Sequence, residues 1–89
     1  MNELGPVHSL RFSRHAVAMA KDRFDLSTDE QAEAFITSEF AAARITYRSK
    51  RYPDQIKVQG DVVCLAYHPA SHKIITMFVS GHIGERNRR

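Results

Sequence analysis

The sequence predicts an α+β fold in which two N-terminal helices pack on one face of a three- to four-stranded antiparallel sheet. Two observations support this prediction. From residue 13 to residue 43, apolar side chains recur at every third or fourth position, which is typical of amphipathic helices. After residue 43 the period changes to two, as in strands with one buried face. Helices followed by a run of strands indicate a two-layer sandwich.

The first elements expected are a weak strand and two helices. Residues 7–12 alternate apolar and polar side chains, as a short half-buried strand does. Ser13 stands where a helix N-cap belongs, and the segment from there to Phe24 contains no Gly or Pro. A second helix is expected at about residues 28–42, because Ser27-Thr28-Asp29-Glu30 has the form of a capping box with Ser27 as the N-cap.

The strands are expected after the second helix. Alternation runs through residues 44–48 and 55–59, and Tyr52-Pro53-Asp54 forms a turn between them. Gly60-Asp61 predicts a tight hairpin, the apolar run 62–67 a central strand, and residues 74–79 a last strand after a turn. In this reading the outer face of the sheet presents to solvent Arg44, Thr46, Arg48 and Lys57.

Size and composition predict one domain over residues 1–80 and a basic, flexible tail over residues 81–89. No apolar run is long enough to span a membrane, and the first residues lack the pattern of a secretory signal. Cys64 is the only cysteine, so no internal disulfide can form. We therefore expect a cytoplasmic protein.

Charge is divided unevenly between the two halves of the chain. Residues 1–43 hold four Lys/Arg and seven Asp/Glu, a net charge of −3, whereas residues 44–89 hold nine and three, a net charge of +6. Because Lys and Arg gain by replacing counterions along a phosphate backbone, the basic half predicts RNA or another nucleic acid as a partner. The residues expected to make these contacts are Arg44, Arg48, Lys50, Arg51, Lys57 and Tyr52.

Tyr47 and Tyr52 lie among these cations, where their rings would stack on unpaired bases. Two alternatives stay open. The same surface would suit an acidic protein such as an antitoxin. It would also be an ordinary solvated sheet face, with Tyr47 in the core because it alternates opposite Arg48.

A metal site is the weaker interpretation of the remaining candidates. Cys64, His68 and His72 lack the CxxC pair or helical HxxxH spacing that zinc sites use. We expect a buried cysteine and two surface histidines, with no metal or cofactor. Thr76 is expected on a strand, with a hydroxyl contact to phosphate as the alternative. The phenylalanines and the methionines at positions 19 and 77 are expected in the core.

Three local motifs carry a resemblance to a known family over about residues 10–79. They are Phe12-Ser13-Arg14-His15-Ala16, then Arg23 followed by Leu26-Ser27, and finally Ile74-Ile75-Thr76-Met77-Phe78. In this order they resemble the RelE/ParE-type toxin fold, and more narrowly the BrnT-related family of small domains of unknown function. The resemblance implies a toxin–antitoxin context, and several members of the wider fold are metal-independent ribonucleases.

Metal-free RNA cleavage needs a base, an acid and cations that stabilise the phosphorane. His15 would serve as base or acid, and Arg23, Arg44 and Arg48 would hold the phosphate. The alternatives are a structural or capping role for His15 and a salt bridge or helix C-terminal role for Arg23. Eight helical residues separate these two side chains by about 80° around the axis and roughly 12 Å along it.

The leading hypothesis is therefore a small RelE/BrnT-like protein that engages RNA on a basic sheet face, with metal-independent endoribonuclease activity as the reaction to test. The alternative is a non-catalytic module that binds nucleic acid or an acidic protein through the same face. An open sheet edge would also allow self-association, so we expect a monomer or a weak dimer.

Overall fold

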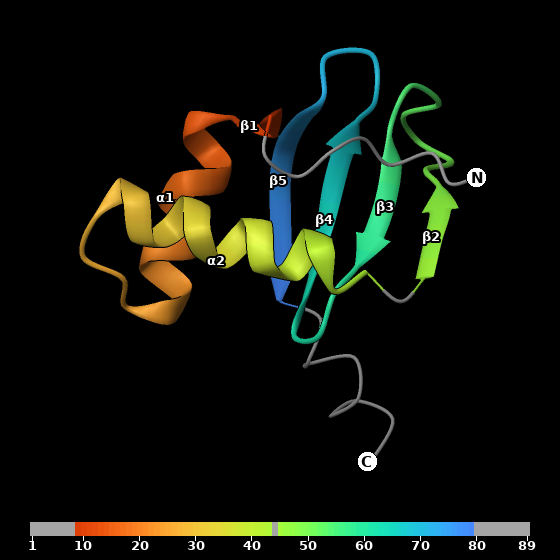
Figure 1. Cartoon of the computed structure of the whole chain (residues 1–89). Coiled ribbons are helices and arrows are strands. Elements are labelled where there is room, and N and C mark those ends of the chain that lie inside the picture. The colour runs from red at the N-terminus through yellow and green to blue at the C-terminus, as the bar shows by residue number, and fades with distance from the viewer. Residues whose placement is uncertain (1–8, 44, 80–89) are drawn as a thin grey trace.

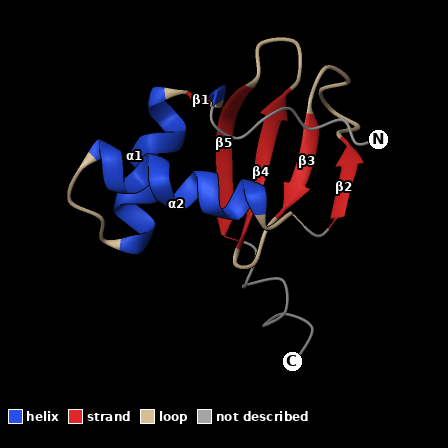
Figure 2. Cartoon of the chain, viewed as in Figure 1, coloured by secondary structure: helices blue, strands red, loops and turns tan. Residues whose placement is uncertain are grey.

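The computed structural model describes residues 9–43 and 45–79. In chain order the elements are β1 (Arg11–Phe12), α1 (Arg14–Phe24), α2 (Asp29–Ala41), β2 (Ile45–Arg48), β3 (Ile56–Gln59), β4 (Val63–His68) and β5 (Lys73–Val79). α2 lies across one face of the sheet and ends before it reaches β2, while α1 lies on the β5 side (Figure 1). The α+β arrangement of two helices against a sheet is confirmed (Figure 2).

The sheet differs from the expected one in strand number and direction. It has five strands in the order β1-β5-β4-β3-β2, and β1 pairs with β5 in parallel, so the prediction of a three- or four-stranded antiparallel sheet is wrong. The last four strands form an antiparallel meander, as expected. Adjacent strands joined by short turns must run antiparallel, whereas β1 reaches β5 only after two helices, and this long connection permits a parallel pair.

Both helices begin at side-chain caps. The Ser13 hydroxyl accepts from the Ala16 N–H at 2.9 Å and also donates to the Ile75 carbonyl, which ties the start of α1 to β5. Thr28, not Ser27, is the N-cap of α2, and its hydroxyl accepts from the Gln31 N–H at 3.1 Å. The expected capping box is therefore shifted by one residue.

No helix in the described ranges is long and apolar enough to cross a membrane.

The core lies between the helices and the α2-facing side of the sheet. Its largest fully buried side chains include Phe40, Ile36, Leu65, Tyr67 and Met77. The rings of Phe40 and Tyr67 meet with centroids 5.0 Å apart. Met19 and the partly buried phenylalanines of β1, α1 and α2 pack around this core.

A close contact joins α2 to the β3–β4 hairpin. The buried carboxylate of Glu39 accepts from the N–H groups of Val62 and Val63 at 2.9 and 3.2 Å. Gly60 lies so close that a Cβ there would be 2.8 Å from the Glu39 carbonyl oxygen. This glycine is needed because the helix approaches the hairpin, not because of a positive φ angle.

Candidate functional site

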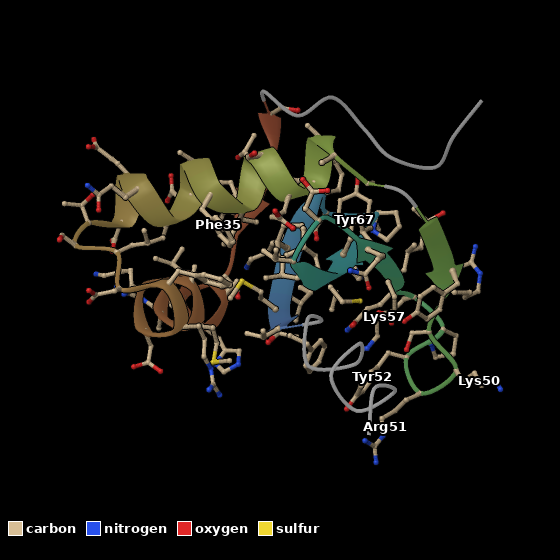
Figure 3. The ribbon with its side chains drawn as sticks, turned by 90° about the horizontal axis from the view of Figure 1, so that it is seen from below. Phe35, Lys50, Arg51, Tyr52, Lys57 and Tyr67 are labelled. Atoms are coloured by element: carbon tan, nitrogen blue, oxygen red, sulfur yellow. The ribbon has the colours of Figure 1, made fainter. Side chains whose placement is uncertain are left out.

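The face of the sheet opposite α2 carries the residues of functional interest, and we call it the open face. Residues directly opposite on antiparallel strands share a face. The strand registers therefore assign to it Tyr47 of β2, Lys57 and Gln59 of β3, Cys64 and Ala66 of β4, and Thr76 and Phe78 of β5. Figure 3 agrees, because Lys57 lies on the side away from α2 while Tyr67 points toward it.

Small residues in the centre of the open face let longer side chains lie across it. Cys64 and Ala66 of β4 are buried although they face away from α2. The ammonium group of Lys57 reaches over the β5 ring of Phe78, 4.5 Å from its centroid, so the lysine stem must cross β4. From the other flank, the Tyr47 hydroxyl lies 3.9 Å from the Cys64 sulfur.

Three aromatic side chains are exposed on or beside this face. Tyr47, Tyr52 and Phe78 are 54%, 50% and 44% exposed. The expectation that every phenylalanine lies in the core is wrong for Phe78. The alternative that placed Tyr47 in the core is also wrong. Exposed aromatic rings of this size offer flat apolar surfaces to a ligand.

The β2–β3 loop places two cations next to these rings. Lys50 and Arg51 are exposed, and the Arg51 and Tyr52 side chains extend toward the open-face side in Figure 3. Backbone bonds hold the loop: the Ser49 N–H donates to the Gln55 carbonyl at 3.1 Å, and the Gln55 N–H donates to the Tyr52 carbonyl at 2.8 Å. The loop is thus an ordered turn that presents consecutive cationic and aromatic side chains.

One expected nucleic-acid contact, Arg48, does not lie on this surface. Arg48 pairs with Ile56, so it lies on the α2 side of the sheet, whereas Lys57 pairs with Tyr47 on the open face. The prediction that Arg48, Thr46 and Lys57 share one face is therefore wrong. Arg48 is still exposed, because α2 ends before β2, and it donates to the Pro53 carbonyl at 3.1 Å. Arg44 lies outside the described residues.

Two histidines flank the β4–β5 turn, and one of them, His68, joins this turn to the β2–β3 loop. His68 Nε2 lies 3.2 Å from the Asp54 carboxylate of the β2–β3 loop, and its Nδ1 lies 2.7 Å from the Ser71 hydroxyl. His72 Nδ1 lies 2.7 Å from the Tyr67 hydroxyl. Within residues 9–43 and 45–79, no group of three His, Cys, Asp or Glu side chains is placed to hold a metal ion.

The Asp54–His68–Ser71 chain has the residue types of a hydrolytic triad, but its surroundings indicate a structural role. The backbone N–H groups of Ser71 and His72 already donate to the carbonyls of His68 and Pro69. These donors are therefore not available for a developing oxyanion, which acyl transfer requires. The chain instead fastens the β2–β3 loop to the β4–β5 turn.

The three residues expected to cleave RNA lie apart. His15 is exposed in the first turn of α1, and Arg23 is exposed in its last turn. Arg48 lies on β2, at the other edge of the sheet. α1 packs against β5, and β5 and β2 are three strand spacings apart, about 14 Å. The described structure does not bring these side chains to one phosphate.

The environment of Tyr47 alters its acidity. Although Tyr47 is 54% exposed, its partial burial raises the pKa of its hydroxyl above the usual value of 10.0, and the neighbouring Cys64 raises it further. The phenol therefore stays neutral at physiological pH and keeps its hydrogen-bonding proton.

One contributor to the open face was missed by sequence reasoning. Phe78 lies in a largely apolar run, Ile74-Ile75-Thr76-Met77-Phe78-Val79, in which no clear alternation marks one face as buried. A register shift between β4 and β5 leaves Ile75 without a direct partner and sets the side to which Phe78 points. The only available signal was its alternation with Met77, whose burial the sequence does predict.

Comparisons of the chain with protein-family models, with curated protein sequences and with solved structures gave no match. The RelE/BrnT resemblance accordingly stays a prediction.

Proposed function

We propose that the protein binds single-stranded RNA on the open face of its sheet. The observation that carries this proposal is the group of three exposed aromatic rings, Tyr47, Tyr52 and Phe78, interleaved with Lys50, Arg51 and Lys57. Proteins that bind single strands combine stacking surfaces for bases with cations for the backbone. The open face offers both kinds of group.

The arrangement favours unpaired bases over a duplex. A base can stack on an aromatic ring only when its own π-face is accessible, which is not so inside a helix. The tyrosines and Phe78 lie on a sheet and a hydrogen-bonded loop, so little backbone freedom remains to be lost on binding. Lys57 already lies over the Phe78 ring, where its charge is close to any base stacked nearby.

The proposal concerns binding, while cleavage remains a separate hypothesis drawn from the RelE/BrnT resemblance. The cleavage hypothesis predicts that RNA is cut in EDTA to 2′,3′-cyclic phosphate ends. It also predicts that His15→Ala abolishes cleavage without lowering the melting temperature. Because His15, Arg23 and Arg48 are not assembled around one phosphate, we favour binding without cleavage.

Fluorescence anisotropy with labelled single-stranded RNA tests the binding proposal. Tyr52→Ala and Phe78→Ala should each weaken binding by about 1–3 kcal/mol, the usual contribution of one stacked base. Val62→Ala is the control for loss of exposed apolar area, because Val62 is 41% exposed just before β4 and has no ring on which a base can stack. The same sequence as a duplex should bind more weakly.

Equal affinities for the aromatic variants and the Val62 control would contradict the proposal. So would tighter binding of the duplex than of the single strand. If wild-type protein binds no RNA but binds an acidic protein through Lys50 and Arg51, the open face is a protein interface and the RNA proposal fails.

A further inference from the structure

A cavity of about 540 Å³ lies where α1 passes the far end of β5. It is lined by Met19, Arg23, Phe24, Met77, Phe78 and Val79. β1 pairs only with Lys73 and Ile74, the first two residues of β5. The same edge of β5 borders the cavity further along the strand, at residues 77–79. The volume falls within the range of about 300–1,000 Å³ that is usual for small-ligand pockets.

The lining suits a flat apolar group that carries a negative charge. Met19 and Met77 contribute flexible, polarizable thioethers, which adapt to aromatic rings, and Phe24 adds an aromatic wall. Arg23 is exposed at the cavity and, among the described residues, has no hydrogen-bond or ion-pair partner. Its planar guanidinium matches the geometry of a phosphate.

The cavity adjoins the open face. Phe78 lies on that face by its pairing with Cys64, and it also lines the cavity. The neighbours of Phe78 in sequence, Met77 and Val79, line it from the α2 side of β5, so the cavity extends around the edge of this strand. A strand of RNA that stacks on Phe78 would therefore arrive at the mouth of the cavity.

We propose that this cavity takes one purine nucleotide of an RNA strand bound on the open face. The base lies between the methionines and Phe24, and its phosphate binds Arg23. A purine is favoured over a pyrimidine because its larger ring buries more apolar surface. The inference rests on the proposed RNA binding, and it names the nucleotide that the site selects.

The methionine methyl groups provide a direct test. The chain has three methionines, and two of them, Met19 and Met77, line the cavity. In protein labelled with ¹³C at the methionine methyls, single-stranded oligoadenosine should shift both signals upfield through the ring current of the base. Met19→Leu and Met77→Leu assign the signals. Oligouridine should give smaller shifts.

Two arginine variants separate a phosphate contact from general charge. Arg23→Ala should weaken binding of oligoadenosine by about tenfold, the usual loss for one charge-assisted hydrogen bond. Arg14→Ala removes one charge from the other end of the same helix, nine residues away, and should change the affinity less than twofold. Binding of oligouridine should be less sensitive to Arg23 than binding of oligoadenosine.

The possible outcomes distinguish this inference from the proposed function. If RNA binds through the tyrosines and Phe78 but leaves both methyl signals unmoved, the cavity inference fails and the proposed function stands. If no RNA binds, both fail. If adenosine monophosphate shifts the methyl signals and RNA does not, the cavity is a site for a free nucleotide, which also overturns the inference.

Discussion

Lys57 and Phe78 illustrate how single residues define the open face. The sequence alone would not place these two residues on one surface, because 21 positions separate them and they lie on non-adjacent strands. Their contact depends on the small side chain of Ala66 between them, the direct partner of Lys57 on β4. A larger residue at that position would block the lysine stem and separate its charge from the aromatic ring.

Glu39 should be among the most important polar residues for stability. Its carboxylate is the acceptor for two N–H groups of the hairpin, so Glu39→Ala should lower the free energy of unfolding by about 1–3 kcal/mol. Glu39→Gln keeps an acceptor oxygen and should cost less. Urea denaturation measures both, with Glu33→Ala on the same helix as the control. A Glu39→Ala loss no larger than that control would contradict this role.

Tyr47 should titrate above pH 10.0, the ordinary pKa of a tyrosine side chain. Burial and the neighbouring Cys64 raise its pKa in the folded state, so the stability contributed by the protonated phenol is complete below pH 10.0 and is lost as the pH rises through the raised pKa. The tyrosinate absorbance that is lost in Tyr47→Phe should have its midpoint above pH 10.0 in the wild-type protein. The unfolding free energy of this variant should fall less steeply in the alkaline range. A difference between the two titration curves with its midpoint at or below pH 10.0 would refute the assignment.

At the scale of elements, the β2–β3 loop is held in place by a contact with the end of β4 and the β4–β5 turn. Asp54 connects it to His68 at the end of β4, and Ser71 lies on the other side of the imidazole ring. The loop contains Lys50, Arg51 and Tyr52, so this connection positions half of the proposed RNA contacts. Ordering the loop in advance lowers the entropic cost of binding.

Removing the connection should release the loop without unfolding the sheet. Asp54→Ala should speed amide hydrogen exchange in residues 49–55 and leave α1 and α2 unchanged. Adding His68→Ala should produce little further change, because the two residues act through one contact. Asp22→Ala, on the exposed side of α1, is the control. Additive effects of the two variants would show that the loop and the turn are independent.

At the scale of the whole molecule, charge is divided between the α2 side of the sheet and the open-face side. The acidic side chains lie mainly on the helices, which build the core, whereas the exposed cations Lys50 and Arg51 lie on the β2–β3 loop beside the open face. For the proposed RNA ligand, this separation favours the open face over the α2 side. It also makes binding dependent on ionic strength, because each neutralised phosphate releases counterions.

The salt dependence of RNA binding should report the number of cations engaged. Each contact to a single strand contributes a slope of about −0.7 in a plot of log affinity against log salt. The triple variant of Lys50, Arg51 and Lys57 to Ala should therefore flatten the slope by about two units. Replacing Arg11 and Arg14 by Ala removes charge away from the open face and should leave the slope nearly unchanged. Equal flattening in both would indicate nonspecific attraction.

The sequence by itself determined the local elements of this protein. The helix N-cap at Ser13, the apolar periodicity of α1 and α2, and the alternation in β3 all depend on neighbouring residues, so their positions were predictable. The basic half of the chain and the stacking role expected of Tyr52 also came from composition and spacing. The N-cap of α2 was one residue off because two adjacent hydroxyl residues compete for that position.

Only the tertiary structure decided which residues share a surface. The loop that joins two strands fixes their pairing register, and with it which of their side chains share a face. A shift of one residue moves a side chain to the opposite face. The β2–β3 loop placed Arg48 on the α2 side and Tyr47 beside Lys57, and the irregular pairing of β4 with β5 set the direction of Phe78. The parallel pairing of β1 and the cavity between α1 and β5 arise from contacts between distant segments, which local periodicity does not encode.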